Sequence, residues 1–122
     1  MKTKLTALLG IAVIGVCLIG SVTAQDKNIR LVRGRKLVLK GEVSDLRDYF
    51  FKARGRQTLT VKLIGQHAVF ELSALHDFDA VTFSEETRSW SGRLPRADSG
   101  VYSVRVISYH KVASYTLEIL LR

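Results

Sequence analysis

The chain has 122 residues, with 19 lysine and arginine residues against 11 aspartate and glutamate residues, and one cysteine. This length allows one small domain with a single hydrophobic core. A lone cysteine cannot form an intrachain disulfide, which excludes a disulfide-stapled scaffold and leaves apolar packing to stabilise the fold.

Residues 1–24 have the pattern of a cleaved signal peptide. Lys2 and Lys4 give a positive amino end, the apolar run LTALLGIAVIGVCLIG follows, and Val22 and Ala24 are the small residues of a cleavage site. The run is short for a membrane span of about 20 residues. Cys17 raises the alternative of a lipoprotein, which the valine before it disfavours. We therefore expect cleavage after Ala24.

Cleavage there leaves one domain over residues 25–122, with 17 basic residues against 11 acidic ones, a net charge of +6 and no cysteine. A small exported domain without disulfides fits the bacterial periplasm better than animal secretion. We expect a periplasmic protein with no membrane span once the signal peptide is removed.

The remaining sequence alternates apolar and polar residues with the period of two that strands show. Turn signals separate the runs, at Gly34, in ARGRQ, in IGQH and in LPRADSG, and no ten-residue segment has a helical stripe. The pattern predicts an all-β protein, an antiparallel β-sandwich of about eight strands that is jelly-roll-like. The expected strands are 36–43, 48–53, 57–64, 67–75, 80–83, 89–94, 101–108 and 114–121.

The segment LPRADSGVY predicts a corner between two strands. Gly100 permits backbone geometry that a side chain would obstruct. Tyr102 can bury its ring and donate its hydroxyl to a backbone carbonyl, as in a tyrosine corner. Asp98 or Ser99 can bond backbone groups in the turn. These residues favour a structural role over a binding role, and the missing cysteine pair excludes an immunoglobulin domain.

Three runs, GEVSDLRDYFFKARGRQTLTVKL, GRLPRADSGVYSVRV and SYTLEILL, resemble the pre-peptidase C-terminal type of β-sandwich. Within that group the chain is most similar to small periplasmic inhibitors of goose-type lysozyme. The matching residues are Asp48, Phe50 or Phe51, Gln57, Leu59, Val61, Leu94, Pro95, Ser99, Gly100 and Tyr102.

The resemblance implies a protein that inhibits lysozyme by presenting loops from one end of the sandwich to the substrate cleft. It implies Ser99, Gly100 and Tyr102 as partner-binding residues, to which we add the adjacent Asp98. We expect a binding protein that is not an enzyme and uses no cofactor.

Charge bears on this hypothesis, because lysozymes are commonly basic and two positive partners repel each other. A local acidic patch would offset the repulsion. Asp77, Asp79, Glu85 and Glu86 lie within ten residues and would serve if they flanked Ser99, with Asp77 and Asp79 as candidate partner-binding residues. A solvated acidic loop or a weak calcium site over residues 76–86 is the alternative.

Other clusters leave a second hypothesis open. The three histidines are scattered and show no catalytic or metal-ligand spacing, so we expect neither an enzyme nor a metal site. Trp90 could stack on a sugar ring or cover the core, and nucleic acid is disfavoured because no aromatic residues interleave with the arginines. Two basic clusters could protect strand edges or bind an envelope polyanion such as lipopolysaccharide or peptidoglycan. They are Arg30, Arg33, Arg35 and Lys36, and Lys52, Arg54 and Arg56.

Overall fold

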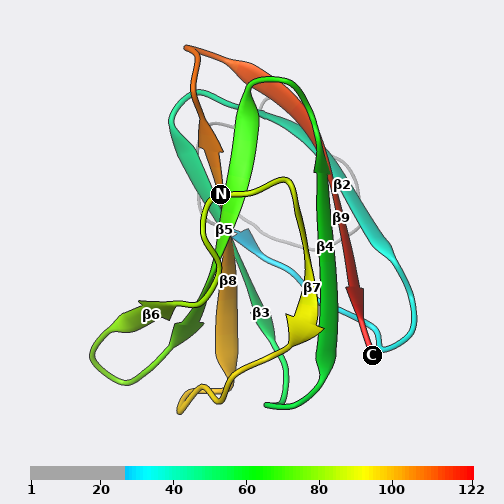
Figure 1. Ribbon diagram of the computed structural model, residues 1–122, viewed down its shortest axis with the longest axis vertical. Helices are drawn as coiled ribbons and strands as arrows, with labels where there is room; N and C mark the ends of the chain where they lie inside the picture. The colour runs from blue at the N-terminus through cyan, green and yellow to red at the C-terminus, as the bar shows by residue number, and fades with distance from the viewer. Residues whose placement is uncertain (1–26) are drawn as a thin grey trace, which may run out of the picture.

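The computed structural model describes residues 27–122, which form two β-sheets that face each other (Figure 1). The predicted signal peptide and Cys17 lie outside the described residues. Within residues 27–122 no helix has the length and apolar character needed to cross a membrane. The strands are β1 (Lys27–Asn28), β2 (Leu37–Val43), β3 (Leu46–Lys52), β4 (Thr58–Ile64), β5 (Ala68–Leu75), β6 (Ala80–Thr82), β7 (Ser89–Arg93), β8 (Val101–Ser108) and β9 (Ala113–Leu121).

One sheet has the strand order β1-β3-β8-β5-β6 and the other has the order β2-β9-β4-β7. Every pair is antiparallel except β1 with β3, which is parallel. The prediction of an all-β antiparallel sandwich is confirmed, with β1 as the element that the sequence did not predict. Two residues are too few to show an alternating pattern, so only pairing with β3 defines this strand.

The core lies between the sheets, where alternate residues of each long strand point inward. In β4, Leu59, Val61 and Leu63 are buried and the residues between them are exposed, as the alternation predicts. Burying one such side chain contributes about 1.5–3 kcal/mol. The most completely buried side chains are Tyr102, Phe51, Phe70, Leu59, Leu72, Leu117, Ile119, Val43, Val61, Val104 and Val106.

A polar cluster also lies between the sheets. Arg47 points inward from β3 and is only 3% exposed. Its Nη1 donates to the Tyr115 hydroxyl at 3.3 Å, and the Tyr115 and Tyr49 hydroxyl oxygens are 2.5 Å apart. A Cβ at Gly41 would lie 3.0 Å from Arg47 Nη1 and 3.1 Å from the Tyr115 hydroxyl. Gly41 therefore leaves the room that the Arg47 guanidinium and the Tyr115 phenol occupy.

The two ends of the sandwich carry different loops (Figure 1). One end, which we call the Ser99 end, holds the β3–β4 turn, the β5–β6 turn and the loop between β7 and β8. Backbone hydrogen bonds join these segments: Arg56 N donates to Leu94 O at 3.0 Å, and Ser99 N to Leu75 O at 3.4 Å. The opposite end holds the β2–β3, β4–β5 and β8–β9 connections.

The buried phenol of Tyr115 makes stability depend on alkaline pH. Burial, reinforced by the adjacent Tyr49 hydroxyl, raises the pKa of Tyr115 above the ordinary value of about 10. The unfolded chain therefore releases this proton at lower pH than the folded chain. The stabilisation is complete below about pH 10 and is lost as pH rises above it. We expect Tyr115→Phe to flatten this alkaline fall in the free energy of unfolding.

Denaturant titration of both proteins at a series of alkaline pH values measures this difference. Titration of the lysines affects both proteins equally, so wild type serves as the reference. Parallel declines in the free energy of unfolding would contradict the assignment.

Candidate functional site

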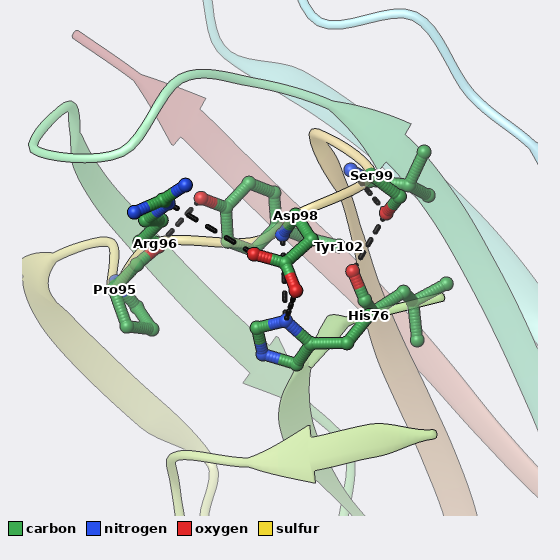
Figure 2. Close-up of polar contacts among 8 residues, drawn as sticks. His76, Pro95, Arg96, Asp98, Ser99 and Tyr102 are labelled. Atoms are coloured by element: carbon green, nitrogen blue, oxygen red, sulfur yellow. Dashed lines mark hydrogen bonds and ion pairs between the residues drawn. The ribbon is translucent and has the colours of Figure 1, made fainter. Parts of the chain in front are cut away.

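Tyr102 forms the corner that the sequence predicts. Its side chain is 1% exposed, and its ring stacks on Phe51 with a centroid distance of 5.7 Å. The hydroxyl donates to the Pro95 carbonyl at 2.6 Å, as Figure 2 shows. Burial raises the pKa of Tyr102, which keeps the phenol protonated and able to donate. Tyr102 thus fixes the loop of residues 94–100 to the core.

Ser99 fastens the same loop to the end of β5. Its hydroxyl donates to the Leu75 carbonyl at 2.6 Å and accepts from the Val101 amide at 3.1 Å. Gly100 follows with φ at +73°, in the left-handed region that glycine adopts without strain. The Gly100 carbonyl also accepts from the Ala53 amide at 3.1 Å. The Ser-Gly-x-Tyr motif therefore joins three segments of the Ser99 end.

A polar contact between His76 and Asp98 makes a second link between the β5–β6 turn and this loop. His76 Nδ1 lies 3.0 Å from Asp98 Oδ2, and it also lies 3.4 Å from the Asp98 amide nitrogen. A protonated Nδ1 donates to the carboxylate, while an unprotonated Nδ1 accepts from the amide. Asp98 thus offers a partner to either form of the imidazole. Arg96 Nε lies 3.9 Å from Asp98 Oδ1, on the other side of the carboxylate (Figure 2).

The predicted acidic patch divides between two parts of the molecule. Asp77 and Asp79 are exposed in the β5–β6 turn, next to the Ser99 loop. This is the position expected for an acidic patch that flanks Ser99. Glu86 instead accepts a hydrogen bond from Tyr109, which lies at the opposite end beside the β8–β9 connection. The reason is that residues 80–88 run back along β5, which separates the two halves of the segment.

Among residues 27–122, the histidines and acidic residues form no group of three that could hold a metal ion.

The second basic cluster lies at the Ser99 end as well. The β3–β4 turn packs on the Ser99 loop so closely that a Cβ at Gly55 would lie 3.5 Å from Arg96 Cα. The exposed Arg54, Arg56 and Arg96 are therefore carried by two adjoining segments. The first basic cluster occupies the connection between β1 and β2, where Lys36 pairs with Glu118 on β9 at 3.5 Å.

Two further residues singled out in the sequence, Trp90 and Asp48, contribute to the structure of the sandwich. Trp90 is half-buried, and its ring meets Phe83 edge-on with a centroid distance of 5.4 Å. It covers the core at the edge strand β7, as the structural alternative predicts. Asp48, in the motif that carries the resemblance, accepts from Arg105 Nε at 2.8 Å and Nη2 at 3.1 Å. This bidentate pair joins β3 and β8 across the outer face of their sheet.

Sequence reasoning found the corner but missed what it contacts. His76 and Asp98 are 22 residues apart, and only the packing of the two loops brings them together. Arg47 occupies an inward position of β3, on the same face as the buried Tyr49 and Phe51, where alternation favours a hydrophobic residue. Partner contact by Ser99, Gly100, Tyr102, Asp98, Asp77 and Asp79 stays a prediction.

No protein-family model matches the chain, and no curated protein matches it. Solved structures do. A mutant of PliG from Escherichia coli, a periplasmic inhibitor of g-type lysozyme, is 20% identical, with a TM-score of 0.61 over 82% of this chain and 100% of PliG. Aeromonas hydrophila PliG is 21% identical, with a TM-score of 0.58 over 80% of this chain and 99% of PliG.

This chain has the PliG fold. The pre-peptidase C-terminal domain of a Bacillus anthracis collagenase is more distant, at 11% identity and a TM-score of 0.51 over 84% of this chain and 100% of the domain. The resemblance read from the sequence is thereby confirmed for the fold. The match covers almost the whole length of the PliG neighbours.

Removing the hydrogen bonds of the corner should lower the stability of the protein measurably. Tyr102→Phe and Ser99→Ala each remove hydrogen bonds whose net contribution is about 1 kcal/mol. We expect each variant to lower the melting temperature by about 4–8 °C in a domain of this size. Ser44→Ala, an exposed change in the β2–β3 turn, is the control and should shift the midpoint little. Melting temperatures equal to wild type for both corner variants would contradict the assigned bonds.

Proposed function

We propose that this protein is an exported inhibitor of lysozyme, with g-type lysozyme as its first target. The observation that carries the proposal is the match to PliG over 99–100% of two inhibitor chains. The signal-peptide pattern of residues 1–24 supports export to the periplasm. The protein acts by binding, without catalysis and without a cofactor.

The Ser99 end is the surface that meets the enzyme in this proposal. Its loops are tied to one another through Ser99, Tyr102 and the His76–Asp98 pair, so little conformational freedom remains to be lost on binding. Asp77 and Asp79 place a local negative charge at the tip of the β5–β6 turn, which suits a basic partner even though residues 25–122 carry a net charge of +6 and arginines lie at the same end. Tyr102 contributes by holding the loop, because its own side chain is buried.

Inhibition of wall lysis tests the proposal. Residues 25–122, added in excess, should suppress the clearing of bacterial cell walls by a g-type lysozyme, because bound loops would exclude peptidoglycan from the cleft. A c-type lysozyme assayed in parallel measures the specificity. Suppression of the c-type enzyme alone would show that the g-type assignment is wrong, and undiminished clearing by both enzymes would reject lysozyme inhibition.

One observation favours a second candidate, a module that binds an anionic envelope polymer. Arg54, Arg56 and Arg96 are exposed on adjoining segments of the Ser99 end, where they could contact phosphate or carboxylate groups together. This function would use the same end of the molecule but a different chemistry.

Salt dependence separates the two candidates. Binding through the arginines should weaken steeply as ionic strength rises, because salt screens exposed charges. Sedimentation with peptidoglycan or lipopolysaccharide at increasing salt measures this, with Arg54→Gln/Arg96→Gln as the variant that should lose binding. Retention that is absent, or that salt leaves unchanged, would reject the polymer-binding function.

A further inference from the structure

Phe78 is the most exposed large apolar side chain among the described residues, at 101% of its reference area. It lies in the β5–β6 turn, between Asp77 and Asp79. Figure 1 shows that the β5–β6 hairpin projects beyond the body of the sandwich near the end that carries the Ser99 loop. Val81 on the same hairpin is 48% exposed. The hairpin therefore presents apolar groups to solvent at a protruding position.

Single exposed hydrophobic residues are common and need no explanation by themselves. Phe78 differs because the hairpin that carries it is held on several sides. His76 N donates to Asp79 O at 2.8 Å within the turn, and the Ser73 and Thr82 hydroxyls are 3.1 Å apart across the strands. An aromatic side chain on an ordered turn can be buried by a partner at low entropic cost.

The Ser99 loop braces the base of this hairpin. Ser99 donates to the Leu75 carbonyl at 2.6 Å, and Asp98 meets His76 at 3.0 Å. Leu75 and His76 immediately precede the tip residues 77–79. The residues of the predicted corner therefore support the base of the hairpin, and Phe78 at its tip is exposed and can contact another molecule.

We infer that Phe78 is the apolar anchor of the partner-binding surface and inserts into the cleft of a protein whose cleft rim is basic. Asp77 and Asp79 flank the ring and face that rim. The inference rests on the proposed function, since the lysozyme cleft is the site that Phe78 would enter. Phe78 supplies binding energy, while Ser99 and Asp98 position the hairpin that carries it.

Affinity measurements with matched variants test the inference. Phe78→Ala should weaken binding to the inhibited lysozyme by about 30-fold or more, the effect of removing a central interface aromatic. Its melting temperature should equal that of wild type, because the side chain is fully exposed. Val112→Ala is the control: Val112 is 57% exposed in the β8–β9 connection at the opposite end, and its affinity should stay within about twofold of wild type.

A second variant reports directly on burial. Phe78→Trp places an indole at the tip, and its emission should shift to the blue when lysozyme is added, beyond any change in the wild-type protein from Trp90. Wild-type affinity in Phe78→Ala, or a Phe78→Trp spectrum that lysozyme leaves unchanged, would overturn the inference while leaving lysozyme inhibition intact. Failure of the wild-type protein to bind any lysozyme would overturn the proposed function and this inference with it.

Discussion

The bond from the Tyr102 hydroxyl to the Pro95 carbonyl determines the arrangement of the Ser99 end. The Tyr102 ring packs in the core against Phe51 and Phe83, so its hydroxyl oxygen has a fixed position. The loop from Leu94 to Gly100 is built around that point. Ser99 and Asp98 in turn bind Leu75 and His76 at the base of the β5–β6 hairpin. A buried aromatic ring thereby orders side chains that are themselves exposed.

Much of the fold could be predicted because the relevant physics is local. Alternation in β4 and β9 reports directly on which residues face the second sheet, and Gly100 with Tyr102 marks a corner by its own chemistry. What could not be predicted depends on packing between distant segments. The His76–Asp98 pair and the parallel pairing of β1 have no local signature. Phe78 stands in a segment without periodicity, and its exposure becomes visible only when the hairpin is seen in place.

The local distribution of charge at the Ser99 end differs from the net charge of the protein. The chain is strongly basic, yet the β5–β6 turn carries aspartates on both sides of its exposed phenylalanine. Arginines from two other segments lie at the same end. A partner approaching this end meets positive and negative groups within one surface. Binding therefore depends on how the partner is oriented as well as on the net attraction between the two proteins. The acidic segment is divided: Glu86 accepts a hydrogen bond from Tyr109, while Asp77 and Asp79 remain at the hairpin tip.

The interior site of Arg47 has a consequence for how such sequences can diverge. The guanidinium is accommodated because position 41 has no side chain and because two phenols supply oxygen atoms to it. Replacing the arginine with an aliphatic residue would remove the donor to the Tyr115 hydroxyl, and enlarging position 41 would displace the arginine. Evolution should therefore exchange Gly41, Arg47, Tyr49 and Tyr115 as a set. Homologues that keep one member and lose another should carry a compensating change inside the sandwich.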